Sequence, residues 1–407
     1  MKKIKTYKFR LYPSKIIERK LQFILNNCRC LYNTQLEYEK QIYFSNREYA
    51  NRTDLNNLIL DWKIINPNLK NIHSQVLQNV SDRLNKSFSN FFTRVKKGEK
   101  PGFPRFKSKD TYNSFTYPQS GFNLNKNKLK LSKIGEINIR AHRKINGKIK
   151  TLIIKKSPTN KWFAYFSVEE TLIKKQSNNN YLGIDVGLNS FYTDSNGNKI
   201  ENPKYLRESE NRLIKIQRKF SKKKKSSKNR KKLRLKLAKL YEKILNQRLD
   251  FLHKQARELA DNYSNIAVEK LQIKNMVKNH YLAKSINDVS WYKFLQLLSY
   301  KVEETGGQIL EVNAKGTSQY CICGNKVKKS LAVRIHKCNK CGIKIDRDVM
   351  SAKLIKAIAF ENYKINIQQV KKVEPKNTVG HTEFQACEVF PLGETVKQES
   401  LASNIIK

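Results

Sequence analysis

Residues 181–197, YLGIDVGLNSFYTDSNG, decide the fold that we predict for this chain. Their apolar residues fall into two short runs joined by a turn, which predicts two neighbouring strands. Asp185 lies in the first run between Gly183 and Gly187, and glycines in a strand let another backbone or a ligand approach closely. A charged side chain is rarely buried in an apolar strand unless it is paired or functional. We therefore treat Asp185 as a candidate functional residue.

Two further acids have comparable settings. Glu269 follows the apolar run 266–268, and Asp348 stands at the start of a helix predicted over about 349–363, after the alternating stretch GIKIDRD. Taken singly, each acid is explained more simply as a salt-bridged or helix-capping residue. Together, on separate elements 84 and 79 residues apart, they match an RNase H-like α/β fold, in which distant strands bring carboxylates to one edge of a sheet.

Such a cluster suits phosphodiester hydrolysis, because the reaction adds charge to a phosphate that is already anionic. Two divalent ions about 3.5–4 Å apart can activate water and hold the leaving oxygen, and hard cations prefer carboxylate ligands. We therefore predict that Asp185, Glu269 and Asp348 are catalytic and bind two Mg²⁺ ions, with Asp185 contacting both.

The charge of the chain points to a polyanionic partner. Among 407 residues, 82 Lys and Arg stand against 34 Asp and Glu, which gives a net charge of +48. Nucleic acid is the commonest partner for such a charge. No stretch approaches a membrane span, and the N-terminus lacks the apolar core of a signal peptide. We therefore expect a soluble, intracellular protein that binds nucleic acid.

Residues 212–239 hold fifteen Lys and Arg and no acid, and the rest of the chain still carries +33. Apolar residues recur within this run, so we predict a helical segment with a break around Lys222–Lys228. A solvated helix face would explain the run, but the absence of any acid to pair with favours a surface that follows phosphates. The predicted nucleic-acid contacts are Lys222, Lys223, Lys224, Lys225, Arg230, Lys231, Lys232 and Arg234.

The N-terminal part of the chain contains two kinds of sequence pattern, one helical and one typical of strands. Residues 4–12 read as a strand, and helical spacing follows from residue 17 to about 97, with breaks near 51–57 and at Pro67. Four later segments alternate apolar and polar residues and predict a small antiparallel sheet or barrel: 128–131, 137–140, 150–155 and 161–169. We expect the first strand to join this sheet, with the helical region of about 14–97 inserted after it.

Two smaller features leave alternatives open. Phe103, Tyr112, Phe115 and Tyr117 alternate with basic residues, so they either stack on bases or pack in a core. Asp288 is predicted to cap a helix that runs through Trp291.

Four of the seven cysteines are concentrated in one segment. Cys321, Cys323, Cys338 and Cys341 form C-x-C, fourteen intervening residues and C-x-x-C, which predicts one structural zinc ion in a ribbon over 317–344. The first pair is one residue shorter than usual, and His336 is an alternative ligand. Four protein ligands leave no open position for catalysis. We expect Cys28 and Cys30 to pack in a core and assign no partner to Cys387.

At this point the residues resemble a known family. GIDVGLNSFYTDSNG, IAVEKLQIKNM, LAKSINDVSWYKFLQLLSYKVEETGGQILEV, TSQYCICG and CNKCGIKIDRDVMSA occur in the order seen in the transposon-encoded TnpB proteins, relatives of the type V CRISPR effectors. The opening YKFRLYPSKIIERKLQFILNNCRCLYNTQLE and the later GFPRFKSKDTYNSFTY are similar too, so the resemblance covers nearly the whole chain.

The resemblance implies an RNA-guided endonuclease that cuts double-stranded DNA and is associated with a transposon. It also implies a cytoplasmic protein, of the prokaryotic cytosol or nucleoid. It implies a monomer with a wedge-like β-barrel, an inserted helical region and a RuvC nuclease domain carrying a zinc ribbon. The domains would be a recognition region over 1–178, the nuclease domain over 179–363 and a tail over 364–407. Its partners would be a guide RNA made from the transposon end and target DNA with a short adjacent motif.

Carried over by motif, the resemblance places the catalytic acids at Asp185, Glu269 and Asp348, and makes Asp346 the lesser alternative for the third. Met350 stands where the family usually has Asn. Two rivals remain open: an RNA-guided DNA-binding regulator with weak or no nuclease activity, and a DNA-joining transposase on the same fold.

Overall fold

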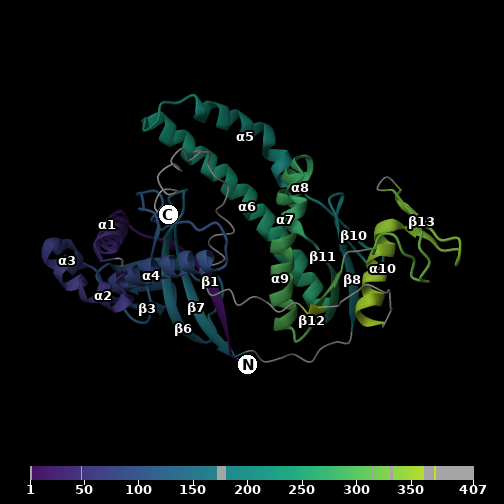
Figure 1. Ribbon diagram of the computed structural model, residues 1–407, viewed down its shortest axis with the longest axis horizontal. Coiled ribbons are helices and arrows are strands. Elements are labelled where there is room, and N and C mark those ends of the chain that lie inside the picture. The colour runs from purple at the N-terminus through teal and green to yellow at the C-terminus, as the bar shows by residue number, and fades with distance from the viewer. Residues whose placement is uncertain are drawn as a thin grey trace. The chain divides into compact units, whose positions relative to one another are not determined.

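The computed structural model describes residues 2–46, 48–171, 180–313, 316–330 and 333–361, and the backbone of a short strand at 371–372. The chain divides into two compact units between Thr171 and Leu172. We call residues 2–171 the N-terminal unit and the described residues from 180 onward the C-terminal unit (Figure 1). Among the described residues, no helix has an apolar stretch of the length that a membrane span requires.

The N-terminal unit is built on an antiparallel sheet of seven strands in the order β2-β6-β7-β1-β5-β4-β3. The first strand of the chain lies inside this sheet, between β7 and β5, as predicted. Its buried side chains alternate along the strand, and Phe9 and Leu11 are fully buried. The strands are β1 (Lys2–Tyr12), β2 (Ser114–Tyr117), β3 (Phe122–Asn125), β4 (Lys128–Leu131), β5 (Gly135–Arg140), β6 (Lys148–Lys156) and β7 (Trp162–Thr171).

The sheet curls until it is nearly closed. Tyr117 at the end of edge strand β2 contacts the ring of Phe122 on the other edge strand, β3, at 6.3 Å between centroids. The Tyr117 hydroxyl also donates a hydrogen bond of 3.1 Å to the carbonyl of Ser132. Tyr112, Phe115 and Tyr117 are all buried in this core, so the hypothesis that they stack on bases is wrong. Phe103 is 38% exposed but packs against Phe88 and Phe91.

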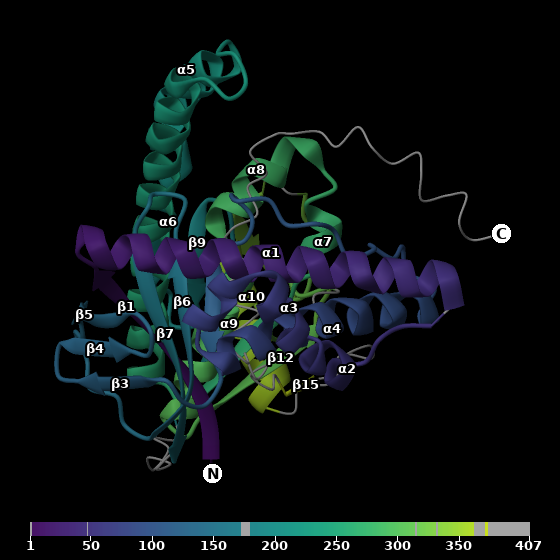
Figure 2. The same ribbon diagram turned by 90° about the vertical axis from the view of Figure 1, so that its left-hand side faces the viewer.

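The helical region inserted between β1 and β2 is also as predicted. Figure 2 shows its long helix α1 running beside α4, and Gln35 of α1 donates a buried hydrogen bond of 2.8 Å to Ser81 of α4. The break predicted near 51–57 falls slightly earlier: residues 48–51 are not helical, and Asn51 then caps a short helix through the N–H groups of Thr53 and Asp54. The helices are α1 (Lys15–Asn46), α2 (Arg52–Asn57), α3 (Ile59–Ile65), the 3₁₀ turn η1 (Pro67–Asn71) and α4 (Ser74–Lys96).

The C-terminal unit contains a mixed sheet in the order β10-β9-β8-β11-β12-β15. The three central strands β8, β11 and β12 are parallel, whereas β9, β10 and β15 pair antiparallel with their neighbours. The strands are β8 (Tyr181–Val186), β9 (Ser190–Asp194), β10 (Lys199–Glu201), β11 (Asn265–Lys270), β12 (Gln308–Asn313) and β15 (Lys371–Lys372).

Helices cover both faces of this sheet, and Figure 1 shows α9 and α10 on opposite sides of it. Ile266 and Val268 of β11 belong to the core formed with α6 and α9, whereas Ala267 between them packs against α10. This alternation is the period of two expected of a strand buried on both faces. The helices are α5 (Tyr205–Ser221), α6 (Lys228–Asn262), α7 (Ile273–Met276), α8 (His280–Val289), α9 (Trp291–Glu304) and α10 (Arg347–Phe360).

Asp288 does not cap the helix that begins at Trp291, contrary to the prediction; its Oδ2 instead accepts from the backbone N–H of Leu206, in the first turn of α5, at 3.3 Å. It lies inside α8 and forms an ion pair of 2.5 Å with Arg248 of α6, with both side chains about nine-tenths buried. The helix that follows begins at Trp291 after Ser290, whose φ of 58° is in the left-handed region. The burial of the Asp288 carboxylate is therefore explained by its ion pair with an arginine on another helix.

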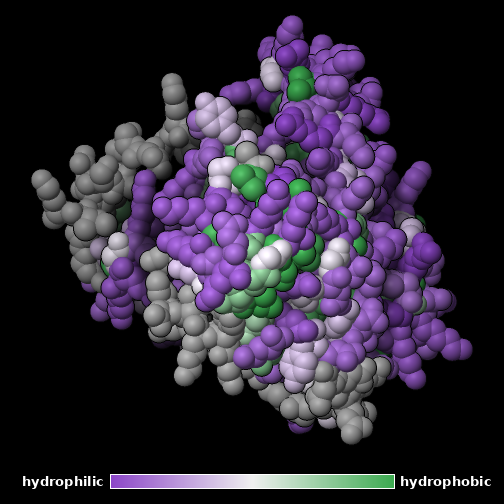
Figure 3. All heavy atoms as spheres, turned by 90° about the vertical axis from the view of Figure 1, so that its right-hand side faces the viewer, coloured by the Kyte–Doolittle hydropathy of each residue, from purple (hydrophilic) through white to green (hydrophobic). Residues whose placement is uncertain are grey.

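The cysteine segment forms a small hairpin of β13 (Ile335–Lys337) and β14 (Lys344–Asp346), which leads directly into α10. Of the cysteines outside this segment, Cys28 is buried as expected, but Cys30 is exposed, so core packing is the wrong role for it. Cys387 lies outside the described residues. The face of the molecule in Figure 3 is mostly hydrophilic, as the net charge of +48 leads one to expect.

Candidate active site and metal centre

Asp185 and Glu269 lie side by side at the ends of two adjacent parallel strands. The paired register of β8 and β11 runs from Tyr181 opposite Asn265 to Ile184 opposite Val268. The next residue on each strand is one of the two acids. Neighbouring strands are about 4.8 Å apart, so the two backbones hold these carboxylates close together.

Both acids lie on the face of the sheet that α10 covers. Ile184 and Val268 belong to the core on the opposite face, so the following residues, Asp185 and Glu269, alternate toward α10. Asp348 occupies the first turn of α10, as predicted. The sheet edge therefore receives two acids from strands and the third from a helix that packs on the same face.

Gly183 allows α10 to lie this close to β8. A Cβ atom at Gly183 would come within 2.1 Å of the carbonyl oxygen of Ala352 and 2.8 Å of the backbone nitrogen of Lys356. The close backbone approach that the sequence predicted at this glycine is thus confirmed. Because the atoms in the way belong to the helix backbone, a side chain at residue 183 must push α10 away from the strand.

We expect Gly183→Ala to lower the melting temperature and to reduce cutting strongly, because it moves Asp348 away from Asp185. A displaced helix in a packed core costs about 1–3 kcal/mol. The measurements are thermal unfolding and DNA cleavage of the full-length protein. Gly102→Ala is the control, because Gly102 has no positive φ and no atom lies within 4 Å of the added Cβ. Wild-type stability and cutting in Gly183→Ala would contradict this account of the glycine.

The electrostatics of the site reflect the crowding of acids. Burial raises the pKa of Asp185 well above its ordinary value, and the negative charges of Glu269 and Asp348 raise it further, while Arg347 opposes them. Burial also raises the pKa of Glu269, and a hydrogen bond of 2.8 Å from the Thr317 hydroxyl to its Oε1 partly offsets this. Perturbed carboxyl groups of this kind are common at catalytic and metal sites.

The structure brings Asp348, rather than Asp346, up to Asp185. Like-charge repulsion on Asp185 comes from Glu269 and Asp348. Asp346 instead caps α10, with its Oδ1 accepting from the N–H groups of Asp348 and Val349 at 2.9 and 3.4 Å. Burial opposes ionisation of Asp346, but its hydrogen bonds from Lys199 and from these N–H groups outweigh burial and lower its pKa.

The sequence did not single out Thr317. It is 2% exposed and its hydroxyl orients the carboxylate of Glu269. The signal available in the sequence was its place four residues before Cys321, at the entry to the cysteine segment. That place alone does not show which strand end the hydroxyl reaches.

The four cysteines predicted to bind zinc lie together. Their sulfur atoms are all within 4.8 Å of one another, with Cys321 and Cys341 at 3.6 Å and Cys323 and Cys338 at 3.6 Å. Zn–S bonds of about 2.3 Å in a tetrahedron would place the sulfurs about 3.8 Å apart, so the cluster fits a structural metal such as zinc.

The short first pair is accommodated by a glycine turn. Gly324, with φ of 85°, donates its N–H to the carbonyl of Cys321 at 2.9 Å, which closes the loop within the shorter spacing. A hydrogen bond from the backbone N–H of Cys341 lowers the pKa of Cys338 to about 6, which favours the thiolate that binds metal. His336 is buried but is not part of the ligand group.

Met350 connects the cysteine cluster to α10. It is 1% exposed and packs in one apolar cluster with Cys321 and Cys338. The residue that departs from the usual pattern of the family therefore has a packing role in this chain.

Three or more His, Cys, Asp or Glu side chains can share one ion only if their ligand atoms lie close together. Within the described parts of the chain, the four cysteines are the one group that meets this condition. The carboxylates of Asp185, Glu269 and Asp348 do not meet at one point in this way. Two ions, each shared between Asp185 and one other acid, would not require them to do so. The carboxylate oxygens of the acids are ligands that suit Mg²⁺, whereas the cysteine sulfurs are ligands that suit zinc.

The basic segment forms a helical hairpin of α5 and α6 with the predicted break between Ser221 and Lys228. Lys222–Lys225 are exposed at its turn. Arg230 differs from its neighbours, because it donates to the carbonyls of Phe220 and Lys223 at 3.1 and 3.0 Å and lies over the Phe220 ring at 4.1 Å. Arg230 thus holds the turn together, while the lysines present their charges to solvent.

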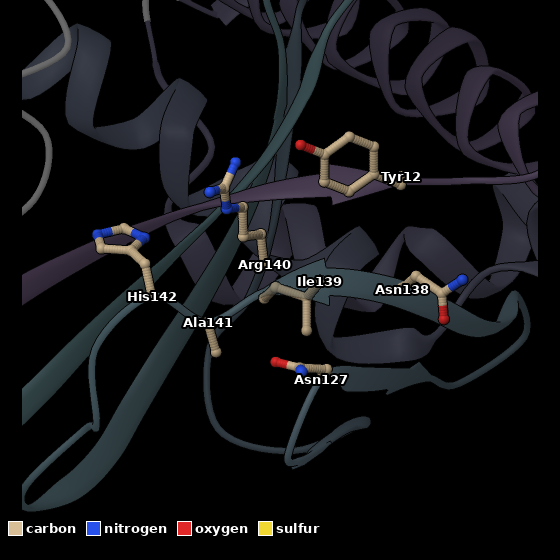
Figure 4. A pocket seen from close by; sticks show the side chains of 7 residues that line it. All are labelled: Tyr12, Asn127, Asn138, Ile139, Arg140, Ala141 and His142. Carbon is tan, nitrogen blue, oxygen red and sulfur yellow. The ribbon is translucent and has the colours of Figure 1, made fainter.

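The N-terminal unit has a second basic surface, at the end of β1 and β5. Tyr12, Asn138, Arg140 and His142 lie around a cavity of about 580 Å³ (Figure 4). Tyr12 is 51% exposed, and the guanidinium of Arg10 lies 5.4 Å from its ring. An exposed aromatic ring among cations is the arrangement on which unpaired bases stack.

Comparison with known proteins identifies relatives of matching length. A Streptomyces pristinaespiralis protein named as an RNA-guided DNA endonuclease is 31% identical over 362 residues, which cover 87% of this chain and 89% of the relative. Escherichia coli InsQ, named in the same way, is 29% identical over 379 residues, covering 88% and 92%. A TnpB-like protein of Acanthamoeba polyphaga mimivirus is 30% identical over 142 residues, or 33% of this chain.

The chain belongs to the TnpB family. The resemblance predicted from the sequence is thereby confirmed. A family described as a probable transposase matches residues 165–280 of this TnpB protein, and a Cas12f1-like TNB domain matches residues 291–355. A helix-turn-helix family matches residues 1–48, where the structure has strand β1 followed by the single helix α1.

The fold of this TnpB protein is similar to that of Cas12f1 in a cryo-EM structure of its complex with sgRNA and target DNA. The TM-score is 0.56 at 14% sequence identity, and the match covers 87% of this chain and 99% of the other. At this identity the likeness concerns the fold, which is Cas12f1-like, with a nearly closed antiparallel sheet and a mixed α/β unit.

Proposed function

We propose that this TnpB protein is an RNA-guided endonuclease that hydrolyses double-stranded DNA at Asp185, Glu269 and Asp348, on an RNase H-like (RuvC) unit that carries a zinc ribbon. The observation that carries the proposal is the convergence of these acids on one face of the sheet, where each like charge raises the pKa of Asp185. The names of the two full-length relatives support the guided-nuclease activity. The parallel centre and antiparallel edge of the sheet support the RNase H-like assignment.

Each acid has a distinct part in this proposal. Asp185 faces both other acids, so we assign it to two Mg²⁺ ions, with Glu269 completing one set of ligands and Asp348 the other. Divalent ions held there would stabilise the charge that the phosphate gains and would lower the pKa of the attacking water. Thr317 fixes the orientation of the Glu269 carboxylate. Asp185, Glu269 and Asp348 are half-buried, and the protein around them strengthens their electrostatic interactions.

The guide would supply sequence recognition. In this division of labour, base pairing reads the target while the protein holds an A-form duplex through its backbone in a basic channel. The exposed lysines of the α5–α6 turn and the Tyr12 surface are the elements we assign to nucleic-acid contact. We propose a guide RNA from the transposon end and a target DNA with a short adjacent motif as partners, and a monomeric protein.

The lysines of the turn allow a quantitative prediction. We expect a change to Gln at any one of Lys222, Lys223, Lys224 and Lys225 to weaken RNA binding, because one phosphate contact is lost. The slope of log affinity against log salt concentration should become less steep by about 0.7–0.9 for each substitution. Filter binding at several salt concentrations measures this slope. Lys254→Gln is the matched control, since Lys254 lies on α6 but pairs with Asp250 at 2.8 Å. Equal slopes for all variants would show that the turn does not follow phosphates.

A DNA-joining transposase is the second candidate, because the family matched at residues 165–280 is described as a probable transposase. It would use the same acids and the same metal chemistry. The products separate the two candidates: the nuclease leaves cut ends, whereas a transposase joins the ends to a second DNA. All three acids are present, which favours either enzyme over a DNA-binding regulator.

The proposed function is tested by purifying the protein from cells that carry its native locus and sequencing the RNA that remains bound. A discrete RNA with a constant part and a variable 3′ end that runs past the element boundary is the expected result. A mixture of unrelated cellular RNA, or none, would contradict the guided function.

A further inference from the structure

Asp346 stands between a lysine and the third proposed catalytic acid. It ends β14 and caps α10, and its Oδ1 accepts hydrogen bonds from the backbone N–H groups of Asp348 and Val349 at 2.9 and 3.4 Å. Its other oxygen, Oδ2, pairs with Nζ of Lys199 at 2.6 Å. One carboxylate thus binds the backbone of Asp348 on one side and a side chain of β10 on the other.

Lys199 lies in the same row of the sheet as Asp185. Asp185 is opposite Thr193 in the pairing of β8 with β9, and Thr193 is opposite Lys199 in the pairing of β9 with β10. Residues directly opposite one another in antiparallel strands project from the same face. Two strand spacings separate the backbones of Asp185 and Lys199, roughly 10 Å, and both side chains lie on the face that α10 covers.

We propose that Lys199 and Asp346 form a positioning pair that fixes Asp348 relative to Asp185, an inference that rests on the proposed function. The sheet row places Lys199 at a set distance from Asp185. Lys199 holds the carboxylate of Asp346, and that carboxylate holds the first turn of α10, where Asp348 lies. Neither residue touches the substrate in this scheme, and each acts through Asp348.

The pair is suited to setting geometry rather than to holding the fold together. The side chains of Lys199 and Asp346 are 41% and 32% exposed, and ion pairs at such exposure contribute little to stability. Both oxygens of Asp346 are engaged by protein donors within hydrogen-bond distance, whereas the ion pair of Asp348 is the longer one from its Oδ2 to Arg334, at 3.8 Å. Groups that orient metal-binding carboxylates affect metal affinity by about 10–100-fold when they are removed.

The test compares Lys199→Met, Lys199→Arg and Asp346→Asn in guided DNA cleavage at increasing Mg²⁺. We expect Lys199→Met and Asp346→Asn to need about 10-fold more Mg²⁺ for half-maximal cutting and to recover most of the rate at saturation. Lys199→Arg should restore the wild-type requirement. Mn²⁺ binding to the full-length protein without RNA, followed by electron paramagnetic resonance, should weaken in the same order, while the melting temperature stays unchanged.

Lys344→Met, which removes an exposed lysine from the same hairpin, is the matched control and should behave as wild type. Wild-type Mg²⁺ dependence in Lys199→Met would overturn the proposal. So would an Asp346→Asn variant that is inactive at every Mg²⁺ concentration, because Asp346 would then be a ligand. Asp185→Asn in the same assay distinguishes a failure of the positioning pair from a failure of the proposed function. If this variant still cuts DNA, the proposed active site itself is wrong.

Discussion

We expect Asp185→Asn to abolish DNA cutting and to raise the melting temperature of the metal-free protein. The loss of cutting follows because Asp185 is the acid that faces both Glu269 and Asp348. The gain in stability follows because burial and these two charges disfavour the ionised carboxylate in the folded state, and an amide removes that cost.

The pH dependence of this effect has a defined sign. The folded-state pKa of Asp185 lies above that of the unfolded chain, so the folded protein keeps a proton that the unfolded chain releases. The wild type therefore loses stability as pH rises from the ordinary carboxyl pKa through the raised value, and Asp185→Asn does not. Each 1 kcal/mol of relief raises the melting temperature by roughly 2–4 °C for a unit of this size.

The measurements are unfolding scans of both proteins in chelator between about pH 4 and pH 8, and cleavage in Mg²⁺. Added Mg²⁺ should raise the melting temperature of the wild type more than that of Asp185→Asn. Asp194→Asn is a matched control, because Asp194 is buried on the adjacent strand β9 but accepts hydrogen bonds from Asn196 and Asn198. Cutting by Asp185→Asn, or a lowered melting temperature that does not vary with pH, would contradict the assignment.

Removal of zinc has the second of the largest expected effects. Two of the four cysteines, Cys338 and Cys341, lie in the turn between β13 and β14, and α10 with Asp348 begins where β14 ends. Structural zinc contributes on the order of 10 kcal/mol to the folding of such a segment. Met350 of α10 packs directly against Cys321 and Cys338, so loss of the metal should loosen the helix that carries the third acid.

We expect about one zinc per chain by elemental analysis, released when the four thiols react with a mercurial reagent. Release should lower the melting temperature and stop cutting even with Mg²⁺ in excess. Cys338→Ser should reproduce both losses, whereas Cys30→Ser should behave as wild type, because Cys30 is exposed and lies outside the cluster. A protein that contains no zinc, or that keeps its melting temperature after release, would contradict the metal centre.

The sequence predicted those parts of the fold in which apolar residues recur with a simple period along the chain. The strands at 181–186 and 265–270 are short apolar runs, and alternation along them places both acids on one face. The break between α5 and α6 was predictable because the charged run interrupts the apolar spacing there. The cysteine cluster was predictable because two close pairs of cysteines at this spacing are typical of a zinc site.

The parts that could not be predicted depend on contacts between distant segments. The sequence left base stacking and core packing open for the aromatic residues between 103 and 117, and only the curled sheet shows that Tyr112, Phe115 and Tyr117 are buried. The place of Asp288 shortly before a helix predicted a helix cap, but in the structure its carboxylate pairs with Arg248 of α6. In the same way, the hydroxyl of Thr317 and the amine of Lys199 acquire their roles only when the strands are aligned.

The catalytic role of the acids and the nucleic-acid role of the lysines remain predictions. The structure brings Asp185, Glu269 and Asp348 together, and it separates Arg230, which holds the turn, from the exposed lysines around it.

The most direct test of the central claim is guided cleavage by the purified protein with its bound RNA, in Mg²⁺, on two plasmids. One plasmid carries a target that matches the variable 3′ part of that RNA beside a library of adjacent motifs, and the other carries a scrambled target. The account predicts double-strand cuts only in the matching plasmid and none with Asp185→Asn. Cutting of both plasmids alike, or cutting that survives in Asp185→Asn, would contradict it.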